Sequence, residues 1–194
     1  MKCDVILAGV GGQGILSIAT VLGRAALALN LTLKQSEVHG MAQRGGSVLA
    51  HLRLSDRPIH SNLIPLGSAS MILAMEPLEL LRYLPWLDPA TGWAVANAVP
   101  IRTIPSYPNP AAVEAEIRRL PRHCLIDADA VARDRGAPRA VNMAMLGAAS
   151  RFLPLPAEAL ESAIAAQFGR KGEAVVAANQ AVFRAGRDAG TPAP

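Results

Sequence analysis

The N-terminal stretch that decides the fold reads Gly9-Val10-Gly11-Gly12-Gln13-Gly14, with an apolar run over 3–8 before it and a helical pattern over 15–29 after it. The apolar run is typical of a strand covered on both faces. The glycines match the spacing GxGxxG, in which a strand, a tight turn and a helix N-terminus present backbone N–H groups to an anion. The alternative is a glycine turn that merely packs a helix on a sheet. The stretch therefore predicts a Rossmann-like start and a candidate phosphate site.

Composition places the chain among folded proteins. It has 194 residues, of which 51% are hydrophobic and 18% charged, and its net charge is +4. Because no basic run alternates with aromatic residues, nucleic acid is not an expected partner. The charged start predicts no signal peptide, the apolar runs are too short to cross a membrane, and the two cysteines, Cys3 and Cys124, fall in strand-like runs. We expect a cytoplasmic protein with both cysteines in its core.

The remaining sequence alternates between strand and helix patterns. Strands are predicted at 31–38, 70–75, 93–98 and 123–127, and helices at 78–84, from 110 onward, and at 142–152, 157–168 and 173–187. This order predicts an α/β fold: an open, largely parallel sheet, with a mixed sheet as the alternative, flanked by helices and followed by a helical C-terminal part. We expect a single domain over 1–190 and a frayed tail over 191–194.

Two segments have unusual patterns. The helix over 15–29 is apolar on more than one side, so either the sheet and a neighbouring helix cover it or another subunit does. Residues 48–55 alternate strictly between apolar and polar, which predicts a half-covered strand, antiparallel or near an edge.

A second polar, glycine-rich segment follows the second predicted strand. Its candidate site residues are Glu37, His39, Gln43, Arg44, Gly45, Gly46 and Ser47. Because the unperturbed pKa of histidine lies near neutral pH, His39 is a candidate acid or base, with a packing role as the alternative. Arg44 can bind an anion or a partner carboxylate, or lie exposed at a turn. Because ligands bind beyond the carboxyl ends of parallel strands, we expect this segment near the first glycine loop, with Glu76, Asn97 and Asp127. Asn97 and Asp127 are equally well explained as turn or cap residues.

No pattern in the sequence identifies a catalytic group, so the catalytic residues are unknown at this stage. His51, His60 and His123 lack the spacing of metal ligands, and no metal site is expected. Asn179, on the apolar face of the last predicted helix, is expected to be a satisfied buried amide. A group of arginines predicts a solvated basic surface: Arg118, Arg119, Arg122, Arg133, Arg135 and Arg139.

The two glycine segments together resemble the gamma-type subunits of the 2-oxoacid:ferredoxin oxidoreductases, and among these most closely the beta (small) subunits of indolepyruvate ferredoxin oxidoreductase. The resemblance is carried by 9–15, 37–48, 76–79, 82–84, 126–128 and 142–147, together with Lys171, Asn179 and Phe183. It therefore covers nearly the whole chain.

This resemblance implies a subunit that works inside a complex. Thiamine diphosphate and iron–sulfur clusters are then expected in a large partner subunit, which oxidises the 2-oxoacid and passes electrons to ferredoxin, and the isolated chain is expected to be inactive. Coenzyme A or a phosphate is the candidate ligand of this chain. The candidate binding residues are Gly9, Gly11, Gly12, Gln13, Gly14, Glu37, His39, Gln43, Arg44, Gly45, Gly46 and Ser47.

Two other functions remain open from the residues alone. GxGxxG with an acidic residue at the end of the second strand, Glu37, also fits a stand-alone NAD(P)-binding enzyme. The lack of a recognisable nucleophile or metal site also fits a non-catalytic scaffold or nucleotide-binding module.

Overall fold

The computed structural model describes residues 1–39, 46–101 and 106–191, with only the backbone of His39 included. The strands are β1 (Lys2–Val10), β2 (Thr32–His39), β3 (Ser47–Ser55), β4 (Met71–Ala74), β5 (Trp93–Asn97) and β6 (His123–Ile126). The α-helices are α1 (Ile15–Ala28), α2 (Pro77–Arg82), α3 (Pro110–Arg118), α4 (Ala128–Asp134), α5 (Val141–Ala149), α6 (Ala157–Phe168) and α7 (Glu173–Ala189). Short 3₁₀ turns, η1 (Leu84–Trp86) and η2 (Gly169–Lys171), follow α2 and α6.

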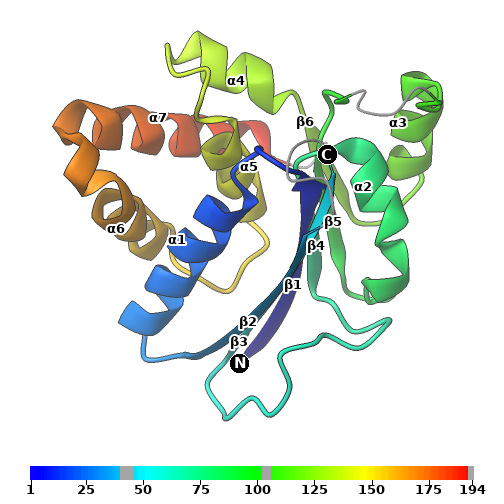
Figure 1. Ribbon diagram of the computed structural model, residues 1–194, viewed down its shortest axis with the longest axis horizontal. Helices are drawn as coiled ribbons and strands as arrows, with labels where there is room; N and C mark the ends of the chain where they lie inside the picture. The colour runs from blue at the N-terminus through cyan, green and yellow to red at the C-terminus, as the bar shows by residue number, and fades with distance from the viewer. Residues whose placement is uncertain (40–45, 102–105, 192–194) are drawn as a thin grey trace.

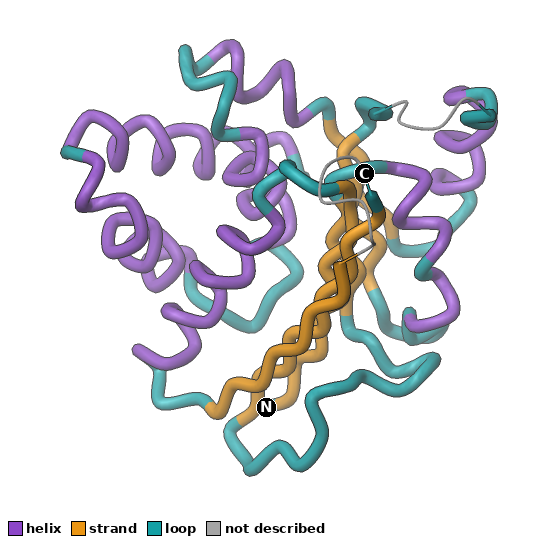
Figure 2. Tube along the Cα trace, in the orientation of Figure 1, coloured by secondary structure: helices purple, strands orange, loops and turns teal. Residues whose placement is uncertain are grey.

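The strands form one six-stranded sheet in the order β2-β3-β1-β4-β5-β6 (Figure 2). β1, β4, β5 and β6 pair in parallel, and β3 runs antiparallel to both of its neighbours, β1 and β2. The expected α/β fold with a largely parallel sheet is therefore confirmed, in its mixed form. In a dinucleotide-binding Rossmann fold the second strand of the chain pairs with the first. In this sheet β3 pairs with β1 instead, and β2 lies at the edge.

Helices cover both faces of the sheet (Figure 1). α1 and the C-terminal helices α5, α6 and α7 lie on one face, and α2 and α3 lie on the other. Successive β1 side chains alternate between the two cores: Val5 and Leu7 pack on the α1 side, and Ile6 and Ala8 on the α2 side. All four are buried, so the prediction that the first strand is covered on both faces is confirmed.

The apolar helix α1 is covered chiefly from within the chain. It packs on the sheet, on α6 and on α5. Gly23 lets α1 approach β2 closely, because a Cβ there would lie 3.0 Å from a methyl carbon of Leu33. Of the two alternatives expected from the sequence, burial by the sheet and a neighbouring helix or burial by another subunit, the first is therefore observed. Leu16 and Leu27 remain 44% and 59% exposed.

The prediction of a half-covered strand at 48–55 is wrong. β3 is antiparallel, as expected, but both of its faces are covered, and His51 is 4% exposed. The segment after β3 folds back over this face: Ile64 N–H donates to His51 Nδ1 at 3.1 Å, and Arg53 Nη1 donates to the Leu63 carbonyl at 2.9 Å. Hydrogen bonds inside the protein thus satisfy the polar side chains that made the strand look solvated.

Helix starts follow the local sequence closely. Asn109 caps α3 by accepting from Ala111 N at 3.0 Å, and Pro110 is its first residue, as predicted. Asp127 accepts from Ala130 N at 2.7 Å and caps α4, a helix that the sequence patterns did not predict.

Two glycines bring α5 and α7 into backbone contact. A Cβ on Gly147 would lie 2.0 Å from the Phe183 carbonyl oxygen, and one on Gly186 would lie 2.1 Å from the Ala144 carbonyl oxygen. This close packing fixes the starts of both helices on the same side of the sheet. Within the described residues, no helix combines the length and the apolarity needed to cross a membrane.

Candidate functional site

The first glycine loop joins β1 to α1 and is stabilised by two hydrogen bonds of the side chain of Gln13. Its side-chain Nε2 donates to the Met75 carbonyl at 2.9 Å, and its Oε1 accepts from Val10 N at 2.8 Å. Gly12 and Gly14 have φ values of 100° and 78°, which side chains other than glycine rarely adopt. The loop is therefore a rigid turn whose amide side chain serves the protein's own backbone.

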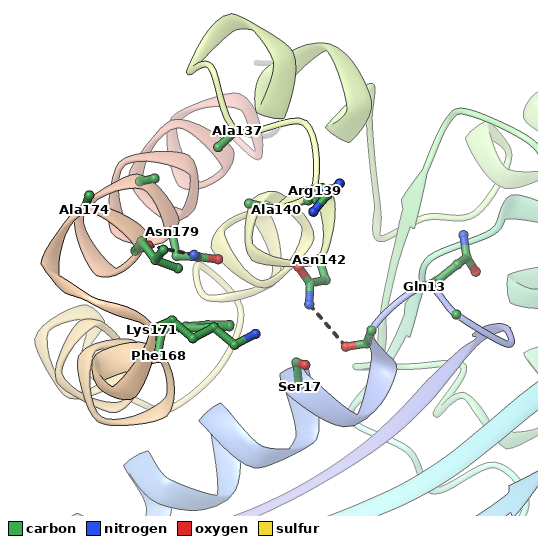
Figure 3. Close-up of a pocket in the computed structure, with 14 residues that line it drawn as sticks. Gln13, Ser17, Ala137, Arg139, Ala140, Asn142, Phe168, Lys171, Ala174 and Asn179 are labelled. Atoms are coloured by element: carbon green, nitrogen blue, oxygen red, sulfur yellow. Dashed lines mark hydrogen bonds between the residues drawn. The ribbon is translucent and has the colours of Figure 1, made fainter.

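A cavity of about 610 Å³ lies beside this loop (Figure 3). It is lined by Gly12, Gln13, Gly14, Ser17, Ala137, Arg139, Ala140, Asn142, Phe168, Lys171, Ala174, Val175, Ala178 and Asn179. These residues come from the start of α1, the segment before α5, the end of α6 and the start of α7. The cavity lies beyond the carboxyl end of β1, where ligands bind in open α/β sheets.

Three helices begin at the wall of this cavity. The N-cap residues of α1, α5 and α7 are Gly14, Ala140 and Gly172, and none of the three supplies a side-chain cap. Gly14, Ala140 and Ala174 line the cavity. Because the first N–H groups of a helix have no partner within it and carry partial positive charge, three uncapped starts favour an anion.

The charged side chains of the lining have the same sign. Arg139 and Lys171 are cationic, and the lining contains no carboxylate. Among the described residues neither has an ion-pair partner, and Lys171 Nζ lies 5.6 Å from the centre of the Phe168 ring. Figure 3 shows Lys171 reaching into the cavity from the α6–α7 side and Arg139 standing beside Asn142. The cavity is therefore suited to a ligand with more than one negative charge.

Two asparagines complete the polar lining. Asn142 Nδ2 donates to the Gly14 carbonyl at 3.3 Å and ties the glycine loop to α5. Asn179, 9% exposed, donates from Nδ2 to the Val175 carbonyl at 2.8 Å. Asn179 is thus bonded within its own helix, as expected of a buried amide, and it also lines the cavity.

On the α2 side of the loop the polar groups bond to one another. The Ser47 hydroxyl donates to Glu79 Oε2 at 2.5 Å and lies 3.0 Å from the Tyr83 hydroxyl. Tyr107 donates to Glu76 Oε1 at 2.5 Å, and Glu76 Oε2 accepts from Glu79 N as the cap of α2. Gly11 N donates to the Gly46 carbonyl at 2.9 Å, which joins this network to the glycine loop.

The predicted site residues divide into three groups. Gly12, Gln13 and Gly14 line the cavity, while Gly11 lies in the same loop and Gly9 lies near the end of β1. Gly46 and Ser47 lie on the α2 side, and Glu37 is on β2, separated from β1 by β3, with Gln35 donating to its carboxylate. Gln43, Arg44, Gly45 and the His39 side chain fall outside the described residues.

Sequence patterns missed the cationic part of the site. Arg139 is exposed, as expected of a solvated basic surface, but it also lines the cavity, because the segment before α5 returns to the glycine loop. The other arginines of that group include exposed ones that pair with glutamates of α3, such as Arg118 with Glu114. Asn142 and Lys171 were notable only through the family resemblance, since no local spacing marks either residue.

The cysteines are unsuited to a metal or a cluster. Cys3 and Cys124 are both buried, and burial raises the pKa of their thiols to about 12 and about 11. They lie on β1 and β6, at separate places in the sheet. Across the described ranges, no group of three or more His, Cys, Asp or Glu residues is arranged to hold a metal ion.

The fold agrees with the family to which the chain belongs. Residues 4–189 match the model of the pyruvate ferredoxin/flavodoxin oxidoreductase family, so the chain is a member of that family. A curated relative, indolepyruvate oxidoreductase subunit IorB of Methanothermobacter thermautotrophicus, is 33% identical over 192 residues, which make up 96% of each chain. The relative is a subunit of an oxidoreductase, and membership therefore implies a partner subunit.

Solved structures share the fold. A 2-oxoglutarate:ferredoxin oxidoreductase from Magnetococcus marinus, with 2-oxoglutarate, coenzyme A and succinyl-CoA bound, aligns with a TM-score of 0.77 at 21% identity. The alignment covers 97% of this chain and 31% of that chain. The gamma subunit of a keto/oxoacid ferredoxin oxidoreductase from Geobacter sulfurreducens aligns with a TM-score of 0.70 at 18% identity, over 98% of this chain and 97% of that chain.

Proposed function

We propose that this chain is the small subunit of a 2-oxoacid:ferredoxin oxidoreductase whose substrate is indolepyruvate or another aryl pyruvate. The complex would release the carboxyl group as CO₂, transfer the acyl group to the thiol of coenzyme A, and pass the electrons to ferredoxin. The near-complete overlap with the IorB subunit supports this substrate class. The proposal treats residues 1–190 as one functional unit.

In this proposal thiamine diphosphate and iron–sulfur clusters, which supply decarboxylation and electron transfer, belong to a large partner subunit. The donor sets of this chain do not fit a cluster, because its two cysteines are buried at separate places in the sheet. The isolated chain would then perform no turnover.

The single observation that carries the role of this chain is the convergence of three uncapped helix starts with Arg139 and Lys171 on one cavity. Coenzyme A is a substrate with several phosphate charges, and the cavity has the volume, charge and N–H groups to bind them. Gly12 supports this assignment, because nothing lies within 4 Å of a Cβ built there, which leaves its backbone open toward a ligand.

The experiment is reconstitution with the large subunit under anaerobic conditions, followed by measurement of ferredoxin reduction. Arg139→Gln and Lys171→Gln should each raise KM for coenzyme A about tenfold, because each removes one charge-assisted contact with a phosphate. The value of kcat at saturating coenzyme A should stay close to that of the unmodified complex. Arg133→Gln, an exposed substitution on α4 that does not line the cavity, is the matched control.

Two results would contradict the proposal. If the reconstituted complex oxidises no 2-oxoacid, the substrate class is wrong. If both cavity variants have the KM of the Arg133→Gln control, the chain contributes only to assembly.

The nicotinamide alternative has less support. Its acidic residue should follow a strand paired with β1, whereas Glu37 is on β2 and is separated from β1 by β3.

A further inference from the structure

β2 forms one edge of the sheet, and this edge is long. The strand has eight residues, which span roughly 26 Å at about 3.3 Å per residue. Within the described residues β2 pairs only with β3, so the backbone N–H and C=O groups on its outer side have no partner strand there. The opposite edge strand, β6, has only four residues. The β2 edge is therefore long enough to accept a further strand.

Most of the features that close an edge strand are missing from β2. Its register with β3 is uninterrupted over 32–39 and 48–55, so no bulge bends it away from a neighbour. Its sequence contains no proline. Its described side chains are half-buried or, in the case of Val38, exposed. The remaining protection is charge, which comes from Lys34 and Glu37.

An apolar row of α1 lies beside this edge. Leu16, Gly23 and Leu27 are spaced at i, i+7 and i+11, so they lie on one face of the helix. Gly23 packs against Leu33 of β2, which directs this face toward β2. Leu16 and Leu27 flank that contact and are exposed. A strand added to β2 would therefore meet apolar side chains of α1.

Exposed apolar side chains are concentrated around this edge. The described residues include eight large apolar side chains that are exposed, and four of them are on α1, on β2 or in the turn between these elements (Figure 1): Leu16, Leu27, Leu29 and Val38. We call these four side chains and the outer side of β2 the β2 edge surface. Contact with a partner would remove this apolar area from water, which favours association.

A second copy of this chain fits the β2 edge surface poorly. Two copies of β2 would pair antiparallel about a two-fold axis, and one residue near that axis would lie opposite its own copy. With the axis anywhere over 33–35, Lys34 is directly opposite or diagonal to its own copy, and over 36–38 the same holds for Glu37. Like charges in these positions repel each other. The edge is therefore suited to a strand of different sequence.

We propose that the β2 edge surface binds an extended strand of the large partner subunit, which adds a seventh strand to the sheet. This inference rests on the partner subunit of the proposed function, but not on the cavity or its ligand. The bound strand carries an acidic residue opposite Lys34, where it forms a cross-strand ion pair. Its side chains on the α1 face are apolar and contact Leu16 and Leu27.

The first test is amide hydrogen exchange, measured by mass spectrometry on the chain alone and in the reconstituted complex. Outward-facing N–H groups of β2 gain hydrogen-bond partners when a strand binds, so their exchange over 32–38 should slow by about tenfold or more. The segment over 60–68 lies outside the β2 edge surface and should exchange at similar rates in both samples.

The second test measures the Kd for the large subunit. Leu27→Lys and Val38→Lys each place a charge in the apolar contact and should raise this Kd about tenfold or more. Leu66→Lys is the matched control, because Leu66 is 64% exposed but lies outside the β2 edge surface, and it should change Kd by less than about twofold. All three side chains are exposed, so the variants should keep the circular dichroism spectrum of the unmodified chain.

Charge reversal tests the chemistry of the bound strand. Lys34→Glu places a carboxylate opposite the expected acidic residue and should also raise Kd about tenfold, with a smaller effect at high salt. An unchanged Kd for Lys34→Glu would contradict an acidic residue at that position.

Three results would overturn the assignment of this edge. Exchange over 32–38 could be the same with and without the large subunit, or Leu27→Lys and Val38→Lys could bind as tightly as Leu66→Lys. The chain alone could also form a dimer that Val38→Lys dissociates, which would assign the edge to a second copy. If the complex still reduces ferredoxin in any of these cases, the proposed function stands without this inference. If the large subunit does not bind the unmodified chain, both are wrong.

Discussion

On the α2 side of the sheet the polar side chains at its carboxyl edge bond to one another, whereas on the α5–α7 side they surround a cavity. Glu76 and Glu79, 2% and 5% exposed, accept from backbone, hydroxyl and guanidinium donors. Arg139 and Lys171 lack ion-pair partners in the residues described. Both sides adjoin the same glycine loop, so position alone does not identify a binding site. The difference is that mutually satisfied groups stabilise the fold, while unpaired ones remain available to a ligand.

The largest expected effect is on the contact between α5 and α7, the two helices whose N-terminal parts line the cavity. Gly147→Ala places a Cβ 2.0 Å from the Phe183 carbonyl oxygen and forces α5 away from α7. We expect the free energy of unfolding, measured in urea, to fall by about 3 kcal/mol or more, as for severe overpacking. Gly169→Ala is the control, because nothing lies within 4 Å of a Cβ there. Equal stability of the two variants would mean that the contact between these helices is loose.

A substitution on the α2 side should change the stability of the protein and not its affinity for a ligand. Glu79→Ala removes the acceptor of Ser47 and Arg82 and should lower the free energy of unfolding by about 2 kcal/mol. KM for coenzyme A in the reconstituted complex should stay within about twofold of its original value, a change worth less than 1 kcal/mol. Glu116→Ala, which removes an exposed ion pair, should change stability by about 0.5 kcal/mol or less. A rise in KM comparable to that of Arg139→Gln would remove the distinction between the two sides.

Because His51 is buried on the α2 side, the free energy of unfolding should depend on pH. Desolvation, with a further contribution from Arg53, lowers its pKa from 6.5. The unfolded chain therefore binds a proton more readily than the folded one, and stability should fall as the pH drops below about 6.5. We expect urea unfolding at pH 7.5 and pH 5.5 to show a smaller difference in His51→Gln than in the unmodified chain. His60→Gln, at an exposed position, should keep the full difference; an unchanged difference in both variants would exclude His51 as the source.

The smallest expected effect is on an exposed ion pair of the cavity side. Arg184 on α7 donates from Nε to Glu161 Oε1 of α6 at 2.9 Å, and this guanidinium lowers the pKa of the Glu161 carboxyl. Because Arg184 is 60% exposed, Arg184→Gln should lower the free energy of unfolding by only about 0.5 kcal/mol, and added salt should reduce the loss. A loss as large as that of Glu79→Ala would show that exposed pairs stabilise this fold as much as buried networks.

Local patterns predicted the parts of the fold that depend on local chemistry. The apolar run before Gly9 and the Asn109–Pro110 helix start both require particular residue types in sequence, and each was found where the sequence indicated. The coverage of β3 was predicted wrongly, because the segment that covers His51 has no periodic pattern and bonds to it through backbone groups.

The candidate site divides in the same way. The sequence identified Gly12, Gln13 and Gly14, since all three belong to the glycine-rich stretch, and the positive φ values of Gly12 and Gly14 favour glycine. No local pattern marked Arg139 as a lining residue, because its place beside the glycine loop depends on residues far away in the chain. Asn142 joins the glycine loop across 128 positions, and Asn97 donates to Asp129 across 32.

The sequence by itself determined the α/β class, the turn geometry of the glycine loop and the family, because these follow from residue type and spacing along the chain. Only the tertiary structure decided that three helix starts and two cations share one cavity while neighbouring carboxylates are already bonded. Charge and hydrogen-bond capacity are visible in the sequence, but whether a group is satisfied depends on which distant residues pack against it.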